Sequence, residues 1–452
     1  MTGILWNFAS FVIALSILVA VHEFGHFWVA RRCGIKVEKF SIGFGKSIWK
    51  KVAKDGTEYS LSMIPLGGYV KMVDTRVDDI SPEQYHIAFD KKPLLQRTAV
   101  VAAGPLFNFA FAIFAYWLVF LIGVPAVKPV VGEVTPYSIA ANAGLEPGME
   151  LTAVSGVKTV DWESVNMGII AHIGDDKLTF TVSDENGIGV AKIKTLDLTE
   201  WNFDPETESA MGTLGFRPYT PEVSMTLANV SDNSAGERAG LLVGDTLVAV
   251  NGVELENWKQ LVESIQGNPE KAVELKIDRD GESLLMTLTP DRRDDRQGKT
   301  IGFAGIGSEV SEWPEKYRFE LQYGVFESIG KSIEKTGQVI GLTATMLKKL
   351  VVGDIGLNNL SGPISIAKGA GTTADYGLVY FLGFLALISI NLGIINLVPL
   401  PMLDGGHLLF FAIEAIIRRP VPEKVQEMGF RIGGVIILSV MAIAIFNDFS
   451  RL

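Results

Sequence analysis

The segment His22-Glu23-Phe24-Gly25-His26 has the residue types and the spacing of a zinc-hydrolase motif. On a helix, two histidines four residues apart share one face, so both imidazoles can reach one Zn²⁺ ion. Glu23 then lies beside the metal-bound water, where its carboxylate serves as the general base. The motif closes an uncharged stretch over residues 4–21, which is long enough to cross a membrane. Ionisable side chains at such a place are costly and by default functional, so the motif predicts zinc-dependent hydrolysis at or within a bilayer.

A third zinc ligand is needed, because hydrolytic zinc sites usually combine three protein ligands with one water. Among the other histidines, His86 lies in a polar stretch and His172 lies in the acidic middle of the chain. Asp404 and His407 both follow a long apolar run and both fit the role, and Glu414 stays open as well. The single cysteine of the chain excludes a thiolate zinc site and an intrachain disulfide.

The composition separates a soluble middle from membrane-associated ends. A chain of 452 residues predicts two or three domains, and a mean hydropathy of +0.28 with 20% charged residues is too apolar for an ordinary soluble enzyme. The formal charge is −11, of which residues 128–320 carry −16 and the remainder +5. This distribution argues against nucleic acid as a partner and favours a water-soluble middle between basic membrane segments.

Four uncharged segments predict four membrane spans: residues 4–21, 98–127, 376–403 and 432–447. The first lacks the basic start and the cleavage site of a signal peptide. Lysines and arginines are concentrated between the first and second spans and between the third and fourth. By the positive-inside rule, both loops are cytoplasmic, and the acidic middle lies across the membrane with both termini. The zinc motif is then near the cytoplasmic side of a multi-pass membrane protein.

The acidic middle is a tandem repeat. At an offset of 96 residues, Ser138, Ala143-Gly144-Leu145, Gly148 and Trp162 fall on Ser234, Ala239-Gly240-Leu241, Gly244 and Trp258. The second copy, through its run from Ala239 to the Asn251-Gly252 turn, resembles the core of a PDZ domain. We expect PDZ domains over residues 128–221 and 222–310, which either bind extracytoplasmic peptides by β-augmentation or exclude bulky substrates.

The two membrane motifs together resemble the site-2 protease family of intramembrane metalloproteases. His22–His26 and the segment Asn396-Leu397-Val398-Pro399-Leu400-Pro401-Met402-Leu403-Asp404-Gly405 match the family's paired signature, HExxH and NxxPxPxxDG, in the correct order. The resemblance covers essentially the whole chain. It implies one Zn²⁺ per chain with Asp404 as the third ligand, and it makes His407 a neighbour of the site. The prolines agree with this, because neither can continue a helix and the break turns Asp404 towards the first span.

The resemblance also implies how a helical substrate is held, since a transmembrane helix must unwind before it can be cut. Residues 58–72 alternate polar and apolar side chains around Gly67 and Gly68, which predicts a membrane-associated β-hairpin that pairs with the substrate. A second glycine pair, Gly43 and Gly45, is expected to shape the cleft floor. Four residues near the third span, Asn391, Asn396, Pro399 and Pro401, are expected to bind the substrate, although the alternative for the two asparagines is hydrogen bonding between helices.

The expected architecture is thus a polytopic α-helical membrane protein with two α+β PDZ domains. Residues 1–127 form an N-terminal membrane part and residues 376–452 a C-terminal one. Residues 311–375 form a linker, with an interfacial helix over 323–350 and a non-helical gate loop over 361–371. The expected function is an endopeptidase that cuts single-span proteins, namely an anti-sigma factor in envelope-stress signalling and remnant signal peptides. The alternatives are a PDZ scaffold with a structural zinc and an anchored protease of soluble peptides.

Overall fold

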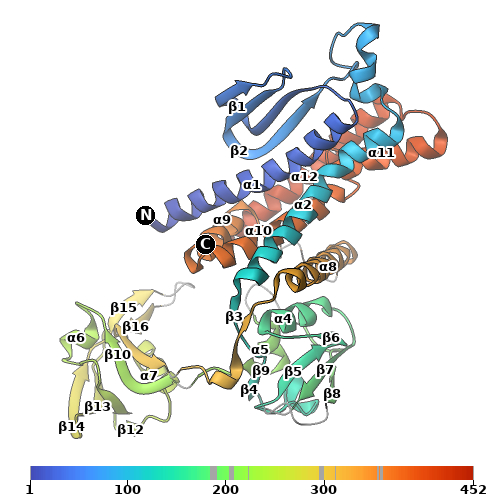
Figure 1. The fold of residues 1–452 in the computed structure, drawn as a ribbon. Helices are drawn as coiled ribbons and strands as arrows, with labels where there is room; N and C mark the ends of the chain where they lie inside the picture. The colour runs from blue at the N-terminus through green and yellow to red at the C-terminus, as the bar shows by residue number, and fades with distance from the viewer. Residues whose placement is uncertain are drawn as a thin grey trace.

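A computed structural model describes residues 2–183, 191–202, 208–221, 223–294, 300–310, 312–353, 356 and 360–450. Within these ranges, four helices are long and apolar enough to cross a membrane: α1 (Thr2–Arg32), α2 (Leu94–Ile122), α10 (Leu378–Leu397) and α12 (Glu423–Ser450). They lie side by side in one bundle (Figure 1). Both chain termini lie at one end of the bundle, and α11 (Asp404–Ile417) lies towards the other end.

The bounds of all four spans differ from those expected, since α12 runs from Glu423 to Ser450 and the other three helices differ as follows. The first helix continues through the histidine motif to Arg32, so the motif lies inside a helix and not at its end. The second ends at Ile122, where Gly123 has φ +96°, and the next residues form strand β3 (Val124–Val127). The third ends at Leu397, because Pro399 and Pro401 follow and cannot donate the hydrogen bonds of a helix. Uncharged composition indicates membrane depth but does not mark where a helix stops.

Small residues let α2 approach its neighbours closely. A Cβ on Gly25 of α1 would lie 2.5 Å from the carbonyl oxygen of Ala103, and a Cβ on Gly104 would overlap the imidazoles of α1. Gly393 of α10 accommodates the ring of Phe109 in the same way. Such glycine contacts are the usual means of close helix packing in membranes, where burial of apolar surface supplies little driving force. As a result, α2 lies directly against the motif-bearing face of α1.

Beside α1 lies a small sheet made of two long, bent strands, β1 (Val37–Val52) and β2 (Glu58–Met72) (Figure 1). Phe40 of β1 pairs with Val70 on one side and with Tyr59 on the other. Leu61 of β2 likewise pairs with two β1 residues, Ile42 and Trp49. Residues 47–52, 58–62, 39–42 and 68–72 therefore lie side by side in that order. The hairpin expected within residues 58–72 is wrong in its pairing, since both limbs of β2 pair with β1 instead of with each other.

The two copies of the sequence repeat share the order of their first seven elements, and they differ after that, where the first has a helix and one strand and the second has three strands. The first repeat unit (residues 128–221) contains β4 (Val131–Val134), α3 (Ile139–Asn142), β5 (Glu150–Val154), β6 (Val157–Lys158), α4 (Trp162–Ala171), β7 (Lys177–Ser183), β8 (Lys192–Asp197), α5 (Ala210–Leu214) and β9 (Phe216–Pro218). The second repeat unit (residues 222–310) contains β10 (Val223–Val230), α6 (Ala235–Arg238), β11 (Thr246–Val250), β12 (Val253–Glu254), α7 (Trp258–Gln266), β13 (Val273–Arg279), β14 (Glu282–Leu288), β15 (Asp291–Asp294), β16 (Thr300–Phe303) and β17 (Ile306–Val310). Each has its own buried apolar core, and the turns at Ser155-Gly156 and Asn251-Gly252 have positive φ at both residues, as tight hairpin turns require.

A short two-stranded sheet connects both repeat units to the helix bundle. β3 follows α2, and β18 (Arg318–Leu321) precedes α8 (Val325–Val352), and the two strands pair antiparallel. The helix predicted over residues 323–350 is confirmed as α8. It packs on α2 and α10 through Val339, and its Lys335 forms an ion pair with Glu163 of the first repeat unit.

The gate loop expected over residues 361–371 is wrong, because α9 (Pro363–Tyr376) is a helix that begins there. Pro363 is compatible with the first helical position, where no N–H is needed. The carboxylate of Asp448, in α12, accepts hydrogen bonds from the backbone N–H groups of Gly362, Ile364 and Ser365. The cap is thus supplied by a residue distant in the sequence, which a local reading of the loop cannot detect.

Candidate metal centre

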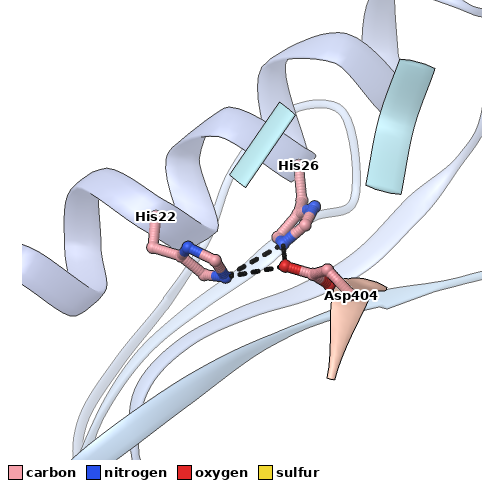
Figure 2. A group of neighbouring side chains, drawn as sticks. All are labelled: His22, His26 and Asp404. Atoms are coloured by element: carbon pink, nitrogen blue, oxygen red, sulfur yellow. Dashed lines mark hydrogen bonds and ion pairs between the residues drawn. The ribbon is translucent and has the colours of Figure 1, made fainter. Parts of the chain in front are cut away.

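Two imidazoles from α1 and one carboxylate from α11 meet at a single point (Figure 2). The Nε2 atoms of His22 and His26 are 3.2 Å apart, and the Oδ2 atom of Asp404 lies 3.3 Å and 3.5 Å from them. Bonds of about 2.0–2.1 Å in a tetrahedron place ligand atoms about 3.3 Å apart. The three side chains therefore fit one face of a tetrahedral zinc site, and the fourth position remains for water or substrate.

The turn between α10 and α11 places Asp404. Its backbone doubles back so tightly that a Cβ on Gly405 would lie 2.3 Å from the carbonyl oxygen of Val398, and Met402 takes a left-handed conformation with φ +86°. Asp404 then begins α11, where the positive end of the helix dipole favours a carboxylate. Its Oδ2 atom is buried and, within the described part of the chain, accepts no hydrogen bond. A buried carboxylate oxygen in this state needs a cation, which is what a metal supplies.

Residues of the second span, α2, contact the Nδ1 atoms of both imidazoles. The Nδ1 atom of His26 lies 2.8 Å from the backbone oxygen of Val100, and the Nδ1 atom of His22 lies 3.1 Å from the side-chain amide of Asn108. Gly104 lies between these contacts. Val100, Gly104 and Asn108 follow one another at intervals of four residues in α2, as His22 and His26 do in α1. The contacts between the two helices therefore recur at successive helical turns. The sequence analysis did not identify these contacts. The signal that could have indicated them is the four-residue spacing of Val100, Gly104 and Asn108 along the second span.

Glu23 and the metal-binding group share one cavity. A cavity of about 620 Å³ is lined by Glu23, by two residues of the metal-binding group, His26 and Asp404, and by His407. Gly68 of β2 lies against the Glu23 side chain, where a Cβ would approach Cγ to 3.0 Å. Further charged groups line the same cavity: Asp74, Arg76, Asp90, Lys91, Arg97, Glu414 and Glu423. The carboxylate of Glu23 is therefore next to the metal group in a polar chamber inside a helix bundle.

The other ligand candidates lie apart from this group. Glu414 accepts two hydrogen bonds from the guanidinium of Arg97, at 3.2 Å and 2.6 Å. His86 is exposed, and His172 contacts the backbone oxygen of Gly168 in the first repeat unit. His407 lines the chamber, with its ring centroid 5.4 Å from that of Phe430. The geometry thus favours Asp404 over Glu414 and His407 as the third member of the metal-binding group.

The residues expected to hold a substrate are dispersed around the centre. Gly68 is adjacent to Glu23, whereas Gly43, Gly45 and Gly67 have positive φ and shape the bends of the β1–β2 sheet. Asn391 accepts a hydrogen bond of 2.9 Å from Thr343 of α8, as the interhelical alternative requires, and Asn396 is half-buried in the last turn of α10. Pro399 is exposed. Pro401 packs against Gly429 and Gly433 of α12, away from the histidines.

Comparison with known proteins settles the family. The sequence model of peptidase family M50 matches residues 10–440 of the chain. The chain belongs to peptidase family M50. It is 73% identical to a candidate zinc metalloprotease of Vibrio cholerae, over the whole of both chains. It is 53% identical to the regulator of sigma-E protease RseP of Escherichia coli and 52% identical to that of Salmonella typhimurium, again over the whole of both chains.

Membership of family M50 confirms the resemblance to site-2 proteases. This M50 protein is therefore an intramembrane zinc metalloprotease, and its cofactor is Zn²⁺. With its four apolar helices, it is an inner-membrane protein. The scaffold alternative, in which the zinc is only structural, is set aside.

Proposed function

We propose that this M50 protease cuts single-span membrane proteins within their transmembrane segments, with His22, His26 and Asp404 as zinc ligands and Glu23 as general base. When bound, Zn²⁺ polarises the scissile carbonyl and acidifies a water ligand. Glu23 accepts the proton of the attacking water and passes it to the leaving nitrogen. The observation that carries the proposal is the shared chamber, in which the Glu23 carboxylate lies beside three converging ligand atoms within a membrane helix bundle.

The β1–β2 sheet supplies an edge for an unwound substrate. Its limb 68–72 is an outer limb of the sheet and reaches Glu23 through Gly68. An extended peptide backbone laid along this limb gains hydrogen bonds that replace those lost when its helix unwinds. Asn396 and Asn391 are proposed to hold freed backbone groups from the opposite side. For Asn391 this role requires that its hydrogen bond from Thr343 be broken.

The repeat units are proposed to be PDZ domains that face the periplasm together with both termini. Support comes from the charge of residues 128–320 and from the basic loops at the opposite ends of the spans. Relatives named as regulators of sigma-E protease support a substrate in sigma-E signalling, for which we propose an anti-sigma factor. Remnant signal peptides are proposed as further substrates on the family resemblance alone. The domain limits are proposed at residues 128, 222, 311 and 376.

The test compares wild-type protein with Glu23→Gln in membranes. A single-span reporter and zinc content are measured on the same preparations. We expect Glu23→Gln to abolish cleavage, with zinc still stoichiometric, because the carboxylate moves protons and is not a ligand. His22→Ala serves as the matched control and should lose zinc and activity together. Strong residual cleavage by Glu23→Gln would remove Glu23 from its proposed role.

A further inference from the structure

Asn108 is a buried amide whose position is explained by neither apolar packing nor substrate binding. Its side chain is fully buried in α2, 3.1 Å from the Nδ1 atom of His22. Its other polar atom, Oδ1, is also buried and has no hydrogen-bond partner among the residues that the structure describes. An unpaired buried amide oxygen destabilises the folded state, because it loses its hydrogen bonds to water without replacement. A residue with this cost in a membrane span needs a compensating role.

The chemistry of His22 determines which amide atom must face it. A neutral imidazole that offers its Nε2 lone pair to a metal carries its proton on Nδ1, so Nδ1 is a donor. His26 already shows this arrangement, because its Nδ1 atom lies against the backbone oxygen of Val100, which can only accept. For His22 to act in the same way, Asn108 must present its oxygen and not its NH₂.

Reversal of the Asn108 amide satisfies this requirement without loss elsewhere. The assignment of oxygen and nitrogen in an amide rests on its hydrogen bonds, and the two orientations have the same shape. The NH₂ group would move to the place that Oδ1 now occupies, and the hydrogen bond that changes is the one to His22, in which Nδ1 becomes the donor. The gain is an N–H···O bond from His22 that fixes both its tautomer and its ring orientation.

We infer that Asn108 is a positioning residue for the zinc ligand His22, and that its carboxamide oxygen accepts the Nδ1 proton. The inference rests on the proposed ligand role of His22. Together, Val100 and Asn108 make α2 the helix that orients both histidines, one through a backbone oxygen and one through a side chain. Partners of this kind typically contribute a factor of about 10–100 in metal affinity.

The test measures zinc affinity by chelator competition on the full chain in detergent, without reference to proteolysis. Asn108→Leu, which has nearly the same shape and no acceptor, should bind zinc about 10–100-fold more weakly. Asn108→Asp should bind at least as tightly as wild type, because an ionised carboxylate accepts the Nδ1 proton more strongly. Ser389→Ala is the matched control, since Ser389 donates to the backbone oxygen of Asn108 and leaves the amide alone. It should bind zinc as wild type does.

The three variants separate the possible outcomes. If Asn108→Asp binds zinc tenfold more weakly than wild type, then the amide donates to His22 and the inference is wrong. Unchanged affinity in a folded Asn108→Leu protein would also overturn it. Should Asn108→Leu fail to accumulate, the comparison of Asn108→Asp with wild type decides alone. Full zinc retention by His22→Ala would instead overturn the ligand set of the proposed function.

Discussion

Val127 and Arg318 are direct cross-strand partners, although both repeat units lie between them in the sequence. The two strands that carry these residues connect the repeat units to α2 and α8, so the chain leaves and re-enters the membrane part at one place (Figure 1). Every group proposed for catalysis lies outside residues 128–317. The repeat units are therefore an insertion whose ends already meet, which makes their removal geometrically feasible.

We expect that replacement of residues 128–317 by an Asn-Gly turn relaxes substrate selection without abolishing catalysis. The variant should still cut a shortened substrate and should begin to cut one with a large periplasmic domain, since a bulky filter has been removed. Reporter cleavage in membranes, with expression matched by immunoblot, measures both. Loss of cleavage of both reporters by a stably expressed variant would show that the repeat units help to assemble the active site, and the filter idea would then fail.

Asp404 and His407 should respond differently to substitution. Asp404→Asn should lower zinc content and activity together, because the amide is a much weaker ligand than the carboxylate at 3.3–3.5 Å from the imidazoles. His407→Ala should keep zinc near one per chain. Metal analysis of purified protein distinguishes the two. A reversed pattern would mean that His407, and not Asp404, completes the site.

Asn391 and Asn396 should matter more for a helical substrate than for one that carries helix-breaking residues. Their proposed task is to hold backbone groups that unwinding sets free. Substitution of both by Leu is compared across a substrate series of graded helix stability. The matched control is Thr343→Val, which removes the partner of Asn391 and leaves its amide intact. Equal losses across the series, reproduced by Thr343→Val, would favour a role in helix packing.

The second repeat unit should lose stability in acid through Asp245. The Arg279 guanidinium, bound to this buried carboxylate at 2.7 Å and 2.8 Å, holds the pKa of Asp245 below its ordinary value of 3.8. A carboxyl with a lowered pKa stabilises the folded state fully above its unfolded pKa, and that contribution is lost as the pH falls through the folded value. Asp245→Asn should therefore cost about 2–4 kcal/mol at pH 7 and progressively less below pH 4.

Hydrogen exchange of the β11 amides, corrected for the intrinsic rate at each pH, measures this difference. Asp232→Asn is the matched control, because Asp232 is an exposed carboxylate of the same unit. A gap between wild type and Asp245→Asn that stays constant from pH 7 to pH 3 would contradict the assignment.

The sequence predicts best where the chemistry is local. His22, Glu23 and His26 share a helix face by their spacing alone, and the Asn-Gly turn of the second repeat follows from its residues. Asp404 needed the family resemblance, because nothing local separates it from His407. Helix α9 was missed because its cap, Asp448, lies some eighty residues later in the chain. The double pairing of β1 with β2 was missed because alternation predicts a strand but not its neighbours.

The order of the ligands along the chain has a consequence for biosynthesis. His22 and His26 emerge from the ribosome among the first residues, whereas Asp404 follows almost four hundred residues later. Until α10 and α11 have been inserted, a nascent chain has two imidazoles and no carboxylate to complete the site. With the proposed ligand set, we therefore expect proteolytic competence only near the end of translation, which would keep ribosome-bound and truncated chains inert towards the newly made proteins around them.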